Sequence, residues 1–168
     1  MTTSEGSQRR ILVMGVSGAG KSTVGEALAR HYQLPFIEAD TLHSAANRAK
    51  MAAGTALTDA DRRPWLTAIH ARLVNEPGGW VLACSALREA YRRVLFEGIG
   101  GVEVVWLTGS AALLSARLAR RRGHFMSPTL LESQIHALEP PEKAIKVDAA
   151  ASIEDTVANV LRELEGGK

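Results

Sequence analysis

Hydrophobic positions along this chain alternate between short continuous runs and patterns at helical spacing. The first run, residues 11–14, is followed by apolar positions Val24, Ala27 and Leu28, which predicts a strand at residues 9–14 and a helix at about residues 21–31. Later runs predict strands at residues 34–40, 80–84, 102–107 and 144–147, and later helical patterns predict helices at about residues 42–54, 58–74, 86–96, 110–122, 129–138 and 152–164. The alternation predicts an α/β fold with three layers, in which about five parallel strands carry helices on both faces.

The chain is expected to form one domain. Its 168 residues are enough to bury a core, and no internal repeat or linker divides them. Residues 1–8 are small and polar, so we expect a disordered N-terminal tail followed by a single domain over residues 9–165.

Composition and charge narrow the classes of partner. Hydrophobic residues make up 46% of the chain and charged residues 23%, as in an ordinary globular protein. The formal net charge of +2 is too small to indicate a nucleic-acid partner. No run approaches the length of a membrane span, and a single cysteine, Cys84, suits a reducing compartment. A cytoplasmic protein with no membrane or nucleic-acid partner is therefore expected.

Residues 15–22 fit the pattern G-x-x-x-x-G-K-[S/T] at every fixed position. They are Gly15, Val16, Ser17, Gly18, Ala19, Gly20, Lys21 and Ser22. Glycines let the backbone turn its N–H groups inward, and the start of the following helix adds partial positive charge. Lys21 supplies a full charge for the β- and γ-phosphates, and the Ser22 hydroxyl is placed to bind Mg²⁺. Since a predicted strand precedes the motif and a predicted helix follows it, we interpret it as a phosphate-binding loop rather than a glycine turn.

Two acids, Glu38 and Asp40, end the second predicted strand. Ligands of open parallel sheets bind beyond the carboxyl ends of the strands. The predicted strands at 80–84 and 102–107 do not end in an acid, although switch and motor NTPases usually carry an Asp there for Mg²⁺. An acid after a strand is most often a cap or a solvated turn. Beside a phosphate loop, however, Glu38 and Asp40 become candidates for orienting Mg²⁺ waters and an acceptor hydroxyl.

A basic block near residue 120 allows two interpretations. Arginines at a helix end are commonly a solvated face or a favourable charge at the helix C-terminus. Arg117 and Arg121 are four residues apart, however, so they share one helix face on which they can meet a polyphosphate. With Gly123 as a hinge, we interpret residues 117–134 as a mobile lid over the nucleotide.

The five histidines show no metal-ligand spacing. His43 lies three residues after Asp40, and His124 lies in the predicted lid, so these two are candidates for hydrogen bonds to a polar acceptor. Cys84 ends a predicted buried strand and is expected to be a core residue rather than a nucleophile.

Together these motifs resemble the gluconate kinases, small P-loop kinases related in fold to shikimate kinase and adenylate kinase. The resemblance covers nearly the whole chain. Its main segments are GVSGAGKST (residues 15–23), EADTLH (38–43), LTDADRRPWL (57–66), ACSALR (83–88), GHFM (123–126), LLESQ (130–134) and LEPP (138–141). Small departures are Ser44 and Ala56, where proline is common, and Glu38, where many members have Asp.

The resemblance implies a P-loop kinase fold and transfer of the ATP γ-phosphoryl group to the 6-hydroxyl of D-gluconate, giving a product for the pentose phosphate or Entner-Doudoroff route. It implies that Lys21, Asp40 and Arg121 are catalytic. It implies that Thr23 and Arg117 bind the nucleotide together with the loop residues. It also implies that Ser22 binds Mg²⁺ directly and that Glu38 binds it through water. The groups available to gluconate are Asp40, His43, Lys50, Arg62, Arg88, Arg92 and His124.

Two alternatives stay open. A related small-molecule kinase with another acceptor would carry the same loop and arginines. A nucleotide-binding switch would need a guanine-reading Asn-Lys-x-Asp element, which this sequence lacks. Homodimers are common in the resembled family, and no stretch of this sequence establishes one.

Overall fold

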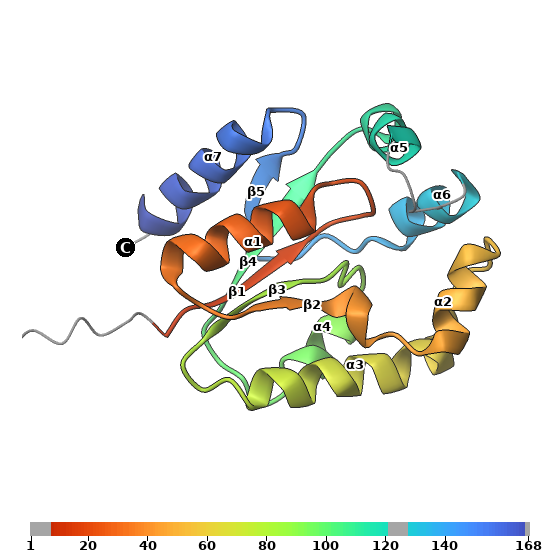
Figure 1. Ribbon diagram of the computed structural model, residues 1–168, viewed down its shortest axis with the longest axis horizontal. Coiled ribbons are helices and arrows are strands. Elements are labelled where there is room, and N and C mark those ends of the chain that lie inside the picture. The colour runs from red at the N-terminus through yellow and green to blue at the C-terminus, as the bar shows by residue number, and fades with distance from the viewer. Residues whose placement is uncertain (1–7, 121–127, 167–168) are drawn as a thin grey trace, which may run out of the picture.

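The computed structural model describes residues 8–120 and 128–166, which form a three-layer α/β domain around one parallel sheet (Figure 1). The strands are β1 (Arg10–Met14), β2 (Phe36–Glu38), β3 (Trp80–Ala83), β4 (Val102–Thr108) and β5 (Ile145–Asp148). Their order across the sheet is β2-β3-β1-β4-β5, and every pairing is parallel. The predicted five-stranded α/β fold is confirmed.

Helices cover both faces of this sheet. They are α1 (Lys21–Tyr32), α2 (Ala45–Ala52), α3 (Asp59–Val74), α4 (Glu89–Leu95), α5 (Ala111–Arg120), α6 (Pro128–Ala137) and α7 (Ile153–Gly166), with a short 3-10 helix, η1 (Ala39–Leu42). Helices α1 and α7 lie on one face and α3 and α4 on the other, while α2, α5 and α6 lie towards the end at which the strands finish (Figure 1). None of the helices in residues 8–120 and 128–166 has the length and apolar character that crossing a membrane requires.

The central strand β1 divides the core in two. Ile11 and Val13 face a cluster with α1 and α7, whereas Leu12 and Met14 face a cluster with α3 and α4. All four side chains are fully buried. This double burial explains why the strand is apolar at consecutive positions rather than at alternate ones.

Several boundaries shift from the predicted ones by up to three residues, as at the start of α2. Two of these shifts lie at the ends of strands and affect the site. The second strand stops at Glu38, and Asp40 lies in η1 instead of continuing the strand. Helix α4 begins at Glu89 rather than near Ala86, because Ala86 takes a left-handed conformation (φ 44°) and Arg88 is extended. Three residues of the predicted helix therefore form a loop at this edge of the sheet.

Capping fixes the start of α3. The Thr58 hydroxyl accepts a hydrogen bond from the Asp61 amide at 3.1 Å, and the Asp61 carboxylate accepts one from the Thr58 amide at 3.0 Å. This reciprocal pair is a capping box, and Thr58 is the N-cap of α3.

Candidate active site

The predicted phosphate loop joins β1 to α1 and is folded as the motif requires. Gly15, Gly18 and Gly20 all have positive φ angles. A Cβ atom on Gly15 would lie 2.6 Å from the Leu107 carbonyl oxygen, and one on Gly18 would lie 3.0 Å from that of Leu114. Only glycine lets the loop pass this closely beneath β4 and α5.

The loop ends in a helix N-terminus that is open to an anion. Gly20 precedes α1 and offers no side-chain cap, so the first amides of the helix are left for a ligand. Lys21 is the first residue of α1, and its ammonium group donates a hydrogen bond to the Val16 carbonyl at 3.1 Å. The lysine is thus folded back over the loop, where a polyphosphate would lie.

The second predicted strand brings its acid to the loop. The Ser22 hydroxyl donates a short hydrogen bond to the Glu38 carboxylate, whose other oxygen accepts from the Asp40 amide at 3.5 Å. Burial raises the pKa of Glu38, and the nearby Asp40 raises it further against the opposing hydrogen bond from Ser22. The Glu38 carboxylate therefore bridges the loop hydroxyl of Ser22 and the backbone of Asp40.

This donor set fits Mg²⁺. Among the described residues there is no group of three or more His, Cys, Asp or Glu side chains that could hold a metal by themselves. Mg²⁺ in phosphoryl-transfer sites is commonly bound by one or two protein oxygens, waters and the substrate phosphates. The Ser22 hydroxyl and the Glu38 carboxylate provide oxygen donors of that kind.

His43 follows directly after η1 and is buried against α3. Its ring stacks on Trp65 with centroids 4.0 Å apart, and Asn47 Nδ2 lies 3.4 Å from its Nδ1. The Trp65 indole N–H donates to the Ala39 carbonyl at 2.7 Å. Burial lowers the pKa of His43. The negative charge of Asp40 raises this pKa, whereas the positive charges of Arg62 and Arg48 lower it further. The ring is therefore neutral at pH 7.

The predicted acceptor cations on α2 and α3 already have protein partners. Lys50 forms an ion pair with Asp61 at 2.8 Å, and that hydrogen bond together with the Thr58 amide lowers the pKa of Asp61 to about 2. Arg62 donates to the Leu57 carbonyl at 2.6 Å and to the Tyr91 hydroxyl at 3.2 Å. The Tyr91 hydroxyl in turn donates to Asp59 at 2.6 Å. These contacts tie α2, α3 and α4 together.

Arg88 and Arg92 differ in their surroundings. The Arg92 guanidinium donates to the Ala86 carbonyl at 2.6 Å and to the Glu139 carbonyl at 2.9 Å, so it braces the loop after β3. Arg88 is exposed at the start of α4, and its guanidinium makes no hydrogen bond or ion pair within the described part of the chain. Arg88 is thus the more available of the two to an anionic ligand.

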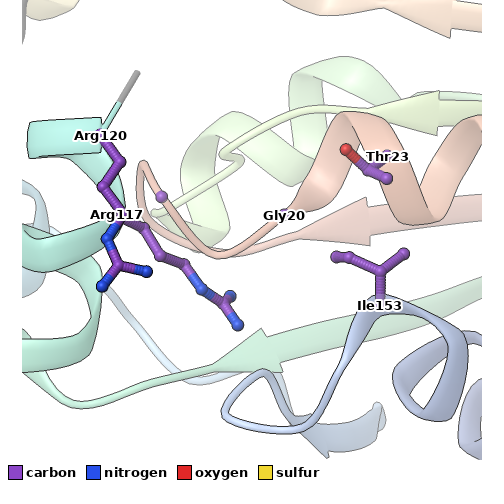
Figure 2. A pocket seen from close by; sticks show the side chains of 6 residues that line it. Gly20, Thr23, Arg117, Arg120 and Ile153 are labelled. Atoms are coloured by element: carbon purple, nitrogen blue, oxygen red, sulfur yellow. The ribbon is translucent and has the colours of Figure 1, made fainter.

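A pocket of about 210 Å³ opens beside the phosphate loop (Figure 2). Its lining residues come from the loop, α1, α5 and the start of α7: Gly18, Gly20, Thr23, Arg117, Arg120 and Ile153. Arg117 and Arg120 extend from α5 on one side, and Ile153 closes the other (Figure 2). Arg117 also donates a short hydrogen bond to the Ala149 carbonyl. Guanidinium groups next to an apolar side chain at the end of a phosphate loop suit the outer part of a nucleotide.

Two predicted site residues are not among the described residues, and three residues that the structure places at the site were not predicted there. Arg121 and His124, predicted in the lid, are not among the described residues, so their roles stay predictions. Arg120 and Ile153 line the pocket although neither was predicted to. Ile153 begins the helix that follows the fifth strand, so the rule that ligands bind beyond the carboxyl ends of parallel strands was the available signal for it. Gln134 was also missed: its side-chain oxygen accepts a hydrogen bond from the Ser17 amide at 2.8 Å.

Comparisons with known proteins agree with this geometry. The family model described as shikimate kinase matches residues 17–160. A probable gluconokinase of Mus musculus is 43% identical, covering 92% of this chain and 97% of its own, and a gluconokinase of Gluconobacter oxydans (strain 621H) is 42% identical, covering 94% and 92%.

Solved structures give the same relation. A gluconokinase from Sinorhizobium meliloti 1021 superposes with a TM-score of 0.86 at 44% identity, over 95% of this chain and 93% of that one. A shikimate kinase from Aquifex aeolicus vf5, at 21% identity and a TM-score of 0.61, shares the fold. The chain belongs to the gluconokinase family, within the wider group of kinases that the shikimate kinase model describes.

Proposed function

We propose that this protein transfers the γ-phosphoryl group of ATP to the 6-hydroxyl of D-gluconate, giving 6-phospho-D-gluconate and ADP. The observation that carries the proposal is the pair of hydrogen bonds that link Ser22 to Glu38 and Glu38 to Asp40. They connect the nucleotide-binding loop with Asp40, the residue we assign to the phosphoryl acceptor. They occur in a chain whose relatives at 37–43% identity include gluconokinases.

The donor half of the site consists of the loop amides, the start of α1 and Lys21, which bind the phosphates of ATP. Ser22, with Glu38 through water, would hold Mg²⁺, which when bound neutralises charge on the phosphate oxygens. Arg117, which lines the pocket beside the loop, is proposed to meet the adenine or the outer phosphates, and Arg121 is proposed to stabilise the transferring group. Loose phosphoryl-transfer transition states need this kind of positioning and cationic support.

The acceptor half is centred on Asp40. Its carboxylate accepts a hydrogen bond from the 6-hydroxyl and takes the proton as the hydroxyl oxygen attacks the γ-phosphorus. The bond between the γ-phosphorus and the bridging oxygen of ADP breaks, and that oxygen leaves with its electron pair on ADP. No further reactant is required.

D-Gluconate presents one carboxylate and several hydroxyls. Neutral His43 can donate to or accept from a hydroxyl, and His124 is proposed to do the same. Three of the four cations already have protein partners. Lys50 forms an ion pair with Asp61. Arg62 donates to the Leu57 carbonyl and the Tyr91 hydroxyl, and Arg92 donates to two backbone carbonyls. Arg88, exposed at the same edge of the sheet, is therefore the cation we assign to the gluconate carboxylate, with the other three arranging the pocket around it.

An acceptor screen tests this function. Purified protein, ATP and Mg²⁺ are assayed for ADP release with D-gluconate, shikimate, nucleoside monophosphates and a panel of sugars and sugar acids. We expect turnover with D-gluconate and at most background turnover with the others. Turnover with shikimate but none with D-gluconate would refute the proposal, and the match to the shikimate kinase model makes that comparison the informative one. The cytoplasmic location and the homodimer stay predictions.

A further inference from the structure

One peptide unit of the phosphate loop is held at both of its ends. The carbonyl of Val16 accepts a hydrogen bond from the Lys21 ammonium at 3.1 Å, and the amide of Ser17 donates one to Gln134 Oε1 at 2.8 Å. This carbonyl and this amide belong to the same planar peptide group, so fixing the direction of one fixes the other. The Val16 carbonyl also accepts a hydrogen bond from the Ala19 amide, at 3.3 Å. Gln134 and Ala19 therefore act together in setting where this carbonyl points and, through it, where Lys21 rests.

Gln134 is well placed for this task because its helix is anchored on both sides. Leu131, one turn earlier on α6, is buried in the same core cluster as Val16 and Ala19 of the loop. Just after α6, the Glu139 amide donates to the Leu87 carbonyl at 2.7 Å. Helix α6 thus connects the phosphate loop with the segment after β3, whose far end carries Arg88.

We propose that Gln134 is a positioning residue for phosphoryl transfer: it orients the Val16–Ser17 peptide so that Lys21 is held ready for the terminal phosphate of ATP. The inference rests on the proposed kinase function. Phosphate-loop lysines reach the β- and γ-phosphates. Since Lys21 lies against Val16, the Val16–Ser17 peptide marks the γ-phosphate end of the loop. Without Gln134, the Ser17 amide would turn toward another acceptor. The Val16 carbonyl, kept only by the 3.3 Å bond from Ala19, would then hold Lys21 less firmly in place.

The test compares Gln134→Met, which keeps the length of the side chain and removes the amide oxygen, with the wild type. Gln134→Ala is a second variant, since alanine favours the helix and cannot clash. Ser133→Ala, at the exposed neighbouring position on α6, is the matched control. Each protein is titrated with ADP and with a non-hydrolysable ATP analogue, and kcat and both KM values are measured with D-gluconate. Thermal melts check that each variant is folded.

Loss of one such hydrogen bond predicts about a tenfold weaker affinity of Gln134→Met for the ATP analogue and about a tenfold lower kcat. The affinity for ADP is expected to fall by less than that for the analogue, because ADP lacks the γ-phosphate and keeps only the β-phosphate contact of Lys21. The KM for D-gluconate is expected to change by less than about twofold, and Ser133→Ala is expected to match the wild type.

Equal losses for ADP and the ATP analogue, or an unchanged kcat, would overturn the proposal. So would tighter binding of the analogue, because Gln134 would then be competing with phosphate for the Ser17 amide. The nucleotide titrations need no acceptor, so they decide the role of Gln134 even if D-gluconate proves not to be the substrate.

Discussion

Replacing Trp65 by phenylalanine tests how the acceptor side of the site is held in place. Trp65 is 5% exposed, its indole N–H donates to the Ala39 carbonyl at 2.7 Å, and its ring stacks on His43. Phenylalanine preserves an aromatic surface for His43 but leaves the Ala39 carbonyl without this donor. Ala39 begins η1, whose i→i+3 bonding provides its carbonyl with a backbone donor as well. Losing the indole therefore costs the net contribution of one hydrogen bond, about 0.5–1.5 kcal/mol of unfolding free energy. For a domain of this size that corresponds to a fall in Tm of about 2–4 °C for each kcal/mol.

The consequence for catalysis follows from the chain order, because Ala39 directly precedes Asp40. A shift of about 1 Å in a positioned group costs up to about 100-fold in rate, so we expect kcat/KM for D-gluconate to fall by about 10- to 100-fold in Trp65→Phe. The KM for ATP should stay within about twofold of the wild-type value. Steady-state kinetics and thermal melts measure both effects on the same preparation.

Trp80→Phe is the matched control for this experiment. Trp80 is fully buried at the start of β3, where it pairs in register with Arg10 at the opposite end of the strands from the site. This variant should lose stability while keeping its kinetic constants. If Trp65→Phe loses stability in the same way and keeps kcat/KM within about twofold, Trp65 is only a core residue and the reasoning is wrong.

Three further predictions concern the same site. Lys21→Ala and Asp40→Asn should each lower kcat by orders of magnitude with little change in Tm, since both act on charge at the ligand-facing edge; a near-normal kcat for Asp40→Asn would remove its role as base. Because burial lowers the pKa of His43 below 6.5, its contribution to stability is complete above that pH and is lost as the pH falls below it. The fall in Tm from pH 7 to pH 5 should therefore be smaller in His43→Phe than in the wild type. An equal fall in the two proteins would contradict this assignment. Gly15→Ala should destabilise the protein by at least about 1–3 kcal/mol in denaturant unfolding, because its Cβ would lie 2.6 Å from the Leu107 carbonyl; an unchanged midpoint would show that the loop adapts.

Much of the fold could be predicted because its signals are local. The apolar run of β1 and the motif of residues 15–22 together specify a strand, a turn and a helix, and the structure has all three. The meeting of Ser22 with Glu38 was also predictable, since parallel strands bring their carboxyl ends to one edge.

Other features depend on contacts that no local pattern encodes. The bond between Ser17 and Gln134 joins residues 117 positions apart, and nothing in the spacing of α6 distinguishes Gln134 from a surface residue. The left-handed Ala86 delays α4, although alanine ordinarily favours helix. Arg92 was predicted at the substrate from the family resemblance and its charge. Its guanidinium donates to two backbone carbonyls that become its neighbours only in the folded chain, and no sequence pattern indicates those contacts.

The most direct test of the central claim is identification of the product by phosphorus NMR after incubation with ATP, Mg²⁺ and D-gluconate. Carbon 6 of gluconate carries two protons, whereas each secondary hydroxyl is on a carbon with one. Transfer to the 6-hydroxyl predicts a new phosphomonoester signal split into a triplet, formed together with ADP and absent in Asp40→Asn. A doublet, or ADP release with no new phosphomonoester, would contradict the account.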